Sequence, residues 1–318
     1  MTLKEEYQAS LKSMDTEEWF DLHFHRPLGF LWAKLFAKLG ISPNAVTVAS
    51  IFMGVVGGIL LYFGQPILAW LNWIGMLLIT WADTFDSADG QLARLTQQYS
   101  RMGRILDGVS GDLWFAAISF ALVFRELDFG DSLLGPNYFA NHEWQIWTLG
   151  VLSGLSHAMQ AAMADYYRQF HLFFLKGKQG SELDSTSKLD EQYRQLDWGR
   201  NFWNKVPMFF YRAYTANQER MTPNMQRLCA ALKERYGDEG VPSQDFRDYF
   251  RKLSLPLMKY TNILTFNTRI IACFIAVIIN MPWLYFAFEI VVLNLLLIYM
   301  VVRHEGICKK ALNYLLKE

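Results

Sequence analysis

The chain has 318 residues, of which 52% are hydrophobic and 16% aromatic, whereas only 19% carry a charge. This composition argues against a disordered chain and against a coiled coil. The 30 basic and 30 acidic residues cancel to a net charge of +0, so no overall positive field attracts nucleic acid. Cys229, Cys273 and Cys308 lie far apart and form no zinc motif or disulfide framework, so we expect free thiols.

The first 41 residues are predicted to form an N-terminal segment that ends at the membrane surface. They lack the basic start and apolar core of a cleavable signal peptide. Between residues 28 and 39, leucines recur at helical spacing on one face, and Lys34 and Lys38 lie off that face. This pattern predicts a short helix lying in the membrane interface.

Several stretches of about 20 residues are apolar enough to be transmembrane helices. Ser42 and Pro43 supply an N-cap and a first helical residue for the first stretch. The expected spans are about 44–63, 66–85, 104–124, 145–166, 260–280 and 282–302. The predicted fold is therefore all-α, a six-helix transmembrane bundle preceded by the interfacial helix.

The distribution of lysine and arginine predicts the orientation of these spans. The connection 126–143 contains acidic residues but no Lys or Arg, and the connections near 64–65 and 280–282 are uncharged. Basic residues gather on the opposite side, among them Lys34, Arg94, Lys176, Arg303 and Lys310. The positive-inside rule then predicts a multi-pass membrane protein with both termini in the cytoplasm.

The longest polar stretch, residues 175–257, is predicted to be a cytoplasmic helical insert between the fourth and fifth spans. Two helices are expected in it, near 201–216 and 223–236. The aromatic-rich sequence FWNKVPMFFYRAY packs either on the bilayer or helix bundle, or in a small core of its own. The predicted domains are the N-terminal segment 1–41, spans one to four in 42–174, the insert 175–257, and spans five and six with a tail in 258–318.

A dense polar cluster follows the second span, in the sequence WADTFDSADGQLARLTQQYSRMGRILDGVSGD. Asp86 and Asp89 are three residues apart and share a helix face. Asp107 lies one turn into the next span, which runs back antiparallel. Acidic residues at membrane depth are costly and indicate function. Carboxylates that meet at the mouth of a bundle suit a hard divalent cation such as Mg²⁺ or Mn²⁺.

This cluster predicts an active site on the cytoplasmic side of the membrane. Metal-assisted attack on a pyrophosphate fits it, with a carboxylate taking the proton of the attacking hydroxyl. Gly90 and Gly103 permit close approach of a phosphate, and Arg94 can pair with one. A transporter is disfavoured, because the acidic residues gather at one mouth instead of along paired broken helices.

The spacing D-x2-D-G-x2-A-R-x8-G-x3-D resembles the signature of the CDP-alcohol phosphotransferase family. The matching residues are Asp86, Asp89, Gly90, Ala93, Arg94, Gly103 and Asp107. The stretch from Ser42 to Thr47 also resembles the family's segment before its first span. The resemblance covers about residues 25–125, and the insert lies outside the usual pattern.

The resemblance implies a transferase that synthesises phospholipid or sphingophospholipid. A CDP-linked donor, either CDP-diacylglycerol or a CDP-alcohol, gives its substituted phosphate to an alcohol acceptor, and CMP leaves. The acceptor stays open among inositol phosphate, glycerol phosphate, diacylglycerol and ceramide types. The resemblance also implies a homodimer and two metal ions. It assigns Asp86, Asp89 and Asp107 to the metal, and Gly90, Ala93, Arg94 and Gly103 to the cytidine nucleotide.

One position departs from the family signature, which has a fourth aspartate at position 111. This chain has Gly111 there, with Asp112 one residue later. A local wide turn, encouraged by Gly108 and Gly111, would bring Asp112 round as the catalytic residue. Alternatively, Asp83, one turn deeper than Asp86, replaces the missing carboxylate. A third possibility is a degenerate, non-catalytic member that binds nucleotide or lipid as a scaffold.

Three further polar residues are candidate substrate contacts. His157 lies in the fourth span, where a packing role is the alternative, and Arg168 lies at its cytoplasmic end, where a surface pair is the alternative. Arg269 lies within the fifth span, where a buried Arg needs an anion or a carboxylate partner. Glu289 is expected near the outer end of the sixth span, too far away to pair with Arg269.

Overall fold

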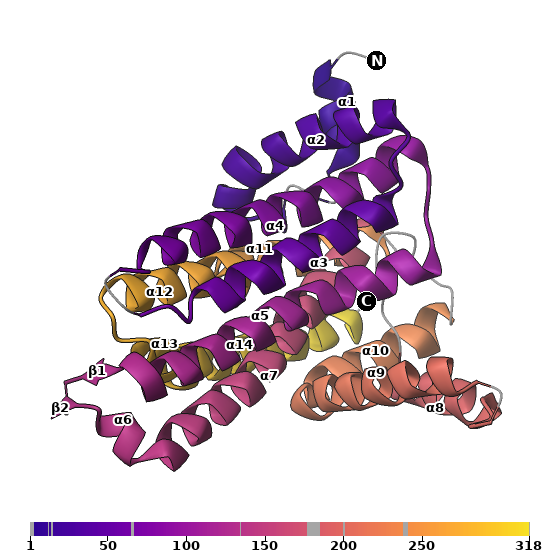
Figure 1. Cartoon of the computed structure of the whole chain (residues 1–318). Coiled ribbons are helices and arrows are strands. Elements are labelled where there is room, and N and C mark those ends of the chain that lie inside the picture. Colours follow the sequence, from indigo (N-terminus) through magenta and orange to yellow (C-terminus); the bar gives the residue numbers. More distant parts are fainter. Residues whose placement is uncertain are drawn as a thin grey trace. The chain divides into compact units, whose positions relative to one another are not determined.

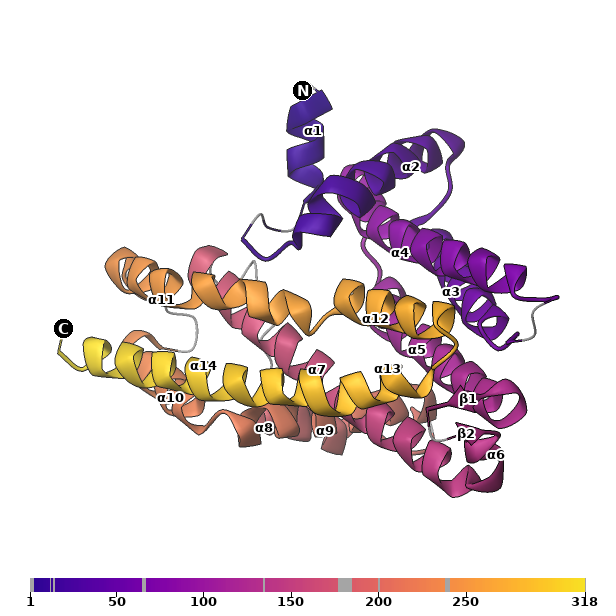
Figure 2. The ribbon, with the colours of Figure 1, turned by 90° about the vertical axis from the view of Figure 1, so that its left-hand side faces the viewer.

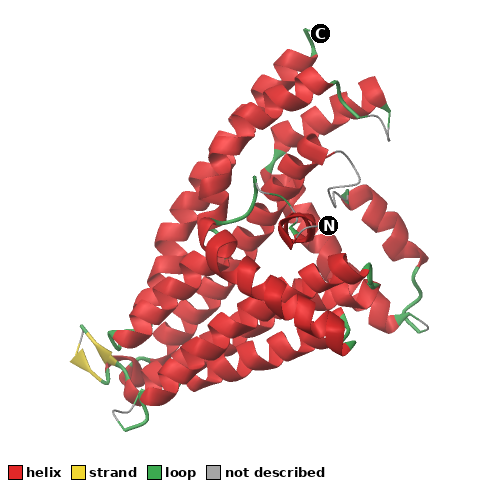
Figure 3. Cartoon of the chain, turned by 90° about the horizontal axis from the view of Figure 1, so that it is seen from above, coloured by secondary structure: helices red, strands yellow, loops and turns green. Residues whose placement is uncertain are grey.

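The computed structural model describes residues 3–11, 13, 15–64, 67–133, 135–176, 185–199, 201–237 and 241–317. Within these residues the fold is all-α, apart from two paired two-residue strands, β1 (Asp131–Ser132) and β2 (Gly135–Pro136) (Figure 3). The chain forms two compact units. The first unit comprises Met1–His157 and Phe266–Val292, and the second comprises Ala158–Thr265 and Leu293–Glu318.

The first unit begins with helices that precede the first apolar span. After α1 (Leu3–Ser10), a π-helical turn, η1 (Asp21–His25), continues directly into α2 (Arg26–Leu39). The helix predicted over residues 28–39 is therefore formed. It ends at Gly40, whose φ of 69° is left-handed and suits glycine.

Three longer helices, α3 (Pro43–Leu60), α4 (Trp70–Thr96) and α5 (Arg101–Phe129), position the polar cluster (Figure 1). Ser42 caps α3 by accepting a hydrogen bond from the Ala45 N–H at 3.3 Å, as its sequence predicts. α3 packs closely on α4 and on α5. A Cβ at Gly57 would lie 2.8 Å from the Gly75 carbonyl oxygen, so small residues let these helices approach.

The remaining elements of the first unit close its apolar core (Figure 2). They are α6 (Tyr138–Asn141), the start of α7 (Glu143–Lys176), α12 (Phe266–Ile278), α13 (Trp283–Ala287) and most of the π-helical turn η3 (Phe288–Leu293). Buried Ile79, Ile118, Cys273 and Phe286 belong to this core. Buried Arg125 donates to the carbonyl oxygens of Leu61 and Val277 and to the side chains of Asn72 and Asn280.

The second unit contains the rest of α7 and five further helices, α8 (Thr186–Gln195), α9 (Phe202–Met221), α10 (Pro223–Tyr236), α11 (Gln244–Ile263) and α14 (Asn294–Leu315). Helices α9 and α10 occupy the two stretches in which helices were predicted. Gln218 of α9 donates to the Ala162 carbonyl of α7 at 2.7 Å. Glu305 of α14 accepts from the first N–H groups of α10, those of Asn224 and Met225, at 2.6 and 3.2 Å.

Four helical segments are long and apolar enough to cross a membrane, namely Pro43–Leu60, Leu106–Phe129, Gln244–Ile278 and Trp283–Leu315. They overlap predicted spans one, three, five and six, although their ends differ. The other two predicted spans form the helices α4 and α7, but polar residues such as Asp83 and His157 lower their hydropathy. By length and hydropathy, the described part of the chain thus has four candidate spans where the sequence analysis expected six.

The three cysteines are free thiols, as predicted. Cys273 and Cys308 are buried, and Cys229 is partly exposed.

Candidate metal centre

The three predicted metal ligands meet in the first unit. Asp86 and Asp89 lie one turn apart on α4, and Asp107 lies near the start of α5. One carboxylate oxygen from each residue lies within 4.8 Å of the other two. The meeting follows from the short connection after Gln97, because α5 then runs back in the opposite direction (Figure 1).

Neighbouring hydroxyl groups hold two of these carboxylates. Ser110 Oγ donates to Asp86 Oδ1 at 2.9 Å, and the Thr47 hydroxyl of α3 donates to Asp89 Oδ2. Asp89 is buried, whereas Asp107 is exposed. Burial, followed by the negative charge of Asp107, raises the pKa of Asp89 to about 7. A divalent cation would remove this repulsion, and three hard oxygen donors fit Mg²⁺ or Mn²⁺.

The residues predicted to bind nucleotide lie between Asp89 and Asp107 in the sequence, at the end of α4 and the start of α5. A Cβ at Gly103 would lie only 2.6 Å from Asn44 Oδ1, so a larger residue where α5 begins beside α3 would have to displace the Asn44 side chain. Gly90 and half-buried Ala93 share α4 with Arg94. Arg94 Nε donates to the backbone carbonyl of Ser10. Arg94 therefore also contacts the N-terminal segment through Ser10, and the sequence did not predict this contact.

The two candidates for the missing fourth carboxylate lie in different surroundings. Helix α5 stays α-helical through Gly108 and Asp112, so the wide turn of the first alternative is not formed. Exposed Asp112 remains about 100° round the helix from position 111. The charge of Asp112 interacts with His157. Asp83 lies one turn before Asp86 on α4, and its charge acts on Asp86.

A second polar cluster, which the sequence analysis missed, includes Asp83. Asp21 and His25 of η1 and Asp83 of α4 each place one ligand atom within 4.8 Å of the others. His25 Nε2 lies 3.1 Å from Asp83 Oδ2. Burial lowers the pKa of His25 to about 4, so the imidazole is neutral at pH 7. The only sequence signal was an Asp and a His four residues apart before the interfacial helix.

Two of the predicted substrate contacts, Arg269 and His157, lie together beside the buried carboxylate of Glu289. Arg269 Nη1 donates to both carboxylate oxygens of Glu289, at 2.9 and 2.7 Å, and lies 2.7 Å from His157 Nδ1. The expectation that Glu289 is too far away is wrong. Asn280 lies in the turn between the two helices. Arg269 is 11 residues before this turn and Glu289 is nine residues after it, so the two side chains lie at similar distances from the turn along neighbouring helices.

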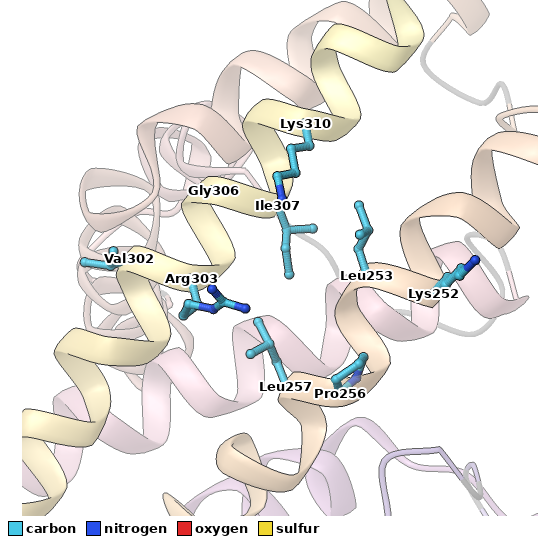
Figure 4. A pocket seen from close by; sticks show the side chains of 9 residues that line it. All are labelled: Lys252, Leu253, Pro256, Leu257, Val302, Arg303, Gly306, Ile307 and Lys310. Carbon is cyan, nitrogen blue, oxygen red and sulfur yellow. The ribbon is translucent and has the colours of Figure 1, made fainter.

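The third predicted contact, Arg168, belongs to the second unit. Its Nη2 donates to Asn262 Oδ1 at 2.8 Å, within the same unit. A cavity of about 460 Å³ also lies in the second unit, between α11 and α14 (Figure 4). Leu253, Leu257 and Ile307 give it apolar walls, and Lys252, Arg303 and Lys310 are its charged lining residues. No carboxylate lines this cavity, so its chemistry differs from that of the aspartate cluster.

Comparison with known proteins identifies the segment that contains the aspartate cluster. Residues 40–164 match the family model described as CDP-alcohol phosphatidyltransferase, a family of transferases. The matched range runs from α3 into α7 and includes Asp86, Asp89 and Asp107. The family resemblance predicted from the signature is confirmed over this range. A search of curated proteins gives no match for the chain.

Proposed function

We propose, on the premise that this chain belongs to the CDP-alcohol phosphatidyltransferase family, that it is a metal-dependent membrane transferase. It transfers a substituted phosphate from a CDP-linked donor to an alcohol acceptor and releases CMP. The observation that carries this proposal is the convergence of Asp86, Asp89 and Asp107 within 4.8 Å, inside the matched segment.

In this proposal, Asp86, Asp89 and Asp107 hold two Mg²⁺ or Mn²⁺ ions. When bound, the metal supplies positive charge that neutralises the diphosphate of the donor. Thr47 orients Asp89 through its hydrogen bond. Gly90 and Gly103 leave room for the nucleotide, and the cationic Arg94 attracts its phosphates. Ala93 completes this nucleotide-binding stretch of α4.

The proposed reaction needs a base for the hydroxyl of the acceptor. A carboxylate takes its proton while the acceptor oxygen bonds to phosphorus and the bond from phosphorus to the CMP oxygen breaks. Asp83 is one candidate base, because it lies one turn from Asp86 on α4 and its charge acts on Asp86. Asp112 is the alternative, and its position on a regular helix turns it away from the signature position 111.

The proposed membrane topology keeps the six predicted spans, with α4 and α7 added to the four candidates. Large apolar side chains are exposed along both helices. Trp73 and Leu77 of α4 are 62% and 63% exposed, and Val151 and Leu155 of α7 are 60% and 65% exposed. Lipid would cover these faces, which water solvates poorly. The distribution of basic residues supports cytoplasmic termini and a cytoplasmic active site.

The acceptor is a polyol phosphate, such as inositol phosphate or glycerol phosphate, or a lipid alcohol, such as diacylglycerol or ceramide. The family also supports a homodimer. Because Arg269 has Glu289 as its anionic partner, Arg269 does not favour a phosphorylated acceptor over a lipid alcohol. The choice of acceptor is therefore left to the assay.

The test measures CMP released by the full-length protein in lipid nanodiscs. CDP-diacylglycerol and CDP-alcohols are each combined with the four acceptor types, with Mg²⁺, Mn²⁺ or a chelator. We expect CMP release that depends on the metal and that is abolished in Asp86→Asn. The control is Glu191→Gln, which replaces an exposed acidic residue of α8 and should retain CMP release.

The same assay tests the alternative function, a nucleotide-binding or lipid-binding scaffold, which Gly111 favours. Metal-dependent CDP binding without CMP from any donor and acceptor pair would replace the transferase proposal with the scaffold.

A further inference from the structure

The second polar cluster, Asp21, His25 and Asp83, has the composition of a separate metal site. One ligand atom from each residue lies within 4.8 Å of the other two. Asp21 and His25 come from η1, and Asp83 comes from α4. Two of the three residues lie outside the range 40–164 that matches the family. The cluster therefore joins the N-terminal segment to the matched segment, which supplies Asp83.

The π-helical turn explains how Asp21 and His25 reach the same place. Its hydrogen bonds run from residue i to i+5 and widen the helix, so residues four apart come close to the same face. Such turns are rare and occur frequently at functional sites. His25 is 1% exposed, so the turn points its imidazole into the protein instead of into solvent.

Hydrogen bonding indicates which nitrogen of His25 carries the proton. Nδ1 lies 3.0 Å from Thr84 Oγ1, and the Thr84 hydroxyl donates to the Thr80 carbonyl at 3.1 Å. A hydroxyl has one proton, so Thr84 accepts from Nδ1–H. Nε2 is then left with a lone pair, 3.1 Å from Asp83 Oδ2. A lone pair facing a carboxyl oxygen in a buried place is repulsive unless a proton or a metal ion joins the two atoms.

The surroundings supply more negative charge than positive charge. Asn267 Nδ2 donates to Asp21 Oδ1 at 2.7 Å and to Glu18 Oε2 at 2.8 Å, which fixes both carboxylates. The neighbouring cation is Arg26, whose Nε–H donates a hydrogen bond to Glu17 Oε2 at 2.9 Å. The carboxyl groups of Glu18, Asp21 and Asp83 therefore surround the His25 imidazole, and the neighbouring Arg26 already has Glu17 as a partner.

We propose that Asp21, His25 and Asp83 bind a divalent transition-metal ion such as Zn²⁺ or Co²⁺, at a site beside the aspartate cluster. Asp83 is then a metal ligand, and the base of the proposed reaction is Asp112. Metal bonds of about 2.0–2.1 Å in tetrahedral geometry hold neighbouring ligand atoms about 3.3 Å apart, close to the 3.1 Å observed between Nε2 and Oδ2. A ligating histidine that gives its other N–H to an oxygen is the usual arrangement. The imidazole ligand favours these metals over Mg²⁺.

The test is a Co²⁺ titration of the full-length protein in nanodiscs with saturating Mg²⁺, followed by visible absorption and by bound metal. We expect about one Co²⁺ per chain, and we expect His25→Gln and Asp21→Asn each to lower the affinity at least about tenfold. The matched control is His23→Gln, because His23 is exposed two residues away and bonds only locally, to the Trp19 carbonyl at 2.7 Å. This control retains the Co²⁺ absorption.

Equal Co²⁺ binding by the wild type and His25→Gln would overturn the proposal, as would complete displacement of Co²⁺ by Mg²⁺. X-ray absorption at the cobalt edge identifies the atoms bound to Co²⁺ in the wild-type protein, so this test does not depend on the folding of a variant. An imidazole nitrogen in the first coordination shell supports the site, and a shell of oxygen alone overturns it. Asp107→Asn separates this site from the proposed function, because it should abolish CMP release while keeping the Co²⁺ absorption.

Discussion

Replacing Arg269 by Met tests whether the buried cation serves the fold or the substrate. Arg269 is 1% exposed and Glu289 is fully buried, and Nη1 contacts both carboxylate oxygens at 2.9 and 2.7 Å. Arg269→Met leaves Glu289 charged and buried, with the Tyr285 hydroxyl still donating to it at 3.0 Å. Removal of one partner of a buried pair costs about 3–5 kcal/mol of unfolding free energy.

The double variant Arg269→Met/Glu289→Leu isolates the cause of this loss. Removing both charges also removes the uncompensated carboxylate, so its stability should return to within about 1 kcal/mol of the wild type. Denaturant unfolding in detergent micelles measures all three proteins. Arg303→Met is the matched control, because the exposed Arg303 should contribute less than about 0.5 kcal/mol.

The CMP assay supplies the result that would refute this reasoning. If Arg269→Met unfolds like the wild type but raises the KM for a phosphorylated acceptor, Arg269 binds substrate and the structural argument fails. If the double variant is as unstable as the single variant, the loss comes from packing instead of from an unpaired charge.

Three further predictions concern the aspartate cluster and its neighbours. Thr47→Val removes the hydroxyl that orients a ligand, so Mn²⁺ affinity measured by titration should fall about 10–100-fold, and an unchanged affinity would contradict this role. Gly103→Ala places a Cβ 2.6 Å from Asn44 Oδ1 and should lower CMP release at least about tenfold, by the cost of overpacking. The double variant Gly103→Ala/Asn44→Ala should recover part of that rate, whereas no recovery would exclude the steric cause. Loss of the catalytic base should slow CMP release about 10²–10⁴-fold, so we expect this loss in Asp112→Asn, and a larger loss in Asp83→Asn would assign the base to Asp83 and contradict its role as a metal ligand.

The helices of this protein follow from local sequence. Apolar runs of about 20 residues, the Ser42 cap and the leucine repeat over residues 28–39 predicted the positions of α2 to α5, because helix formation depends on neighbours a few residues away. Asp86 and Asp89 were predictable for the same reason. A short connection then returned Asp107 to them, and all three lie within the family signature.

Contacts between distant residues depended on tertiary packing. Asp83 contacts His25, which lies 58 residues earlier in the sequence. The pairing of Arg269 with Glu289 depends on how far each residue lies from the turn between their helices, and only the structure places that turn. Asn267 bonds Glu18 across 249 residues. Helical periodicity states which residues share a face, but it says nothing about which distant helix covers that face. The tertiary structure therefore decided the second polar cluster, whereas the sequence by itself determined the helices and the aspartates of the first.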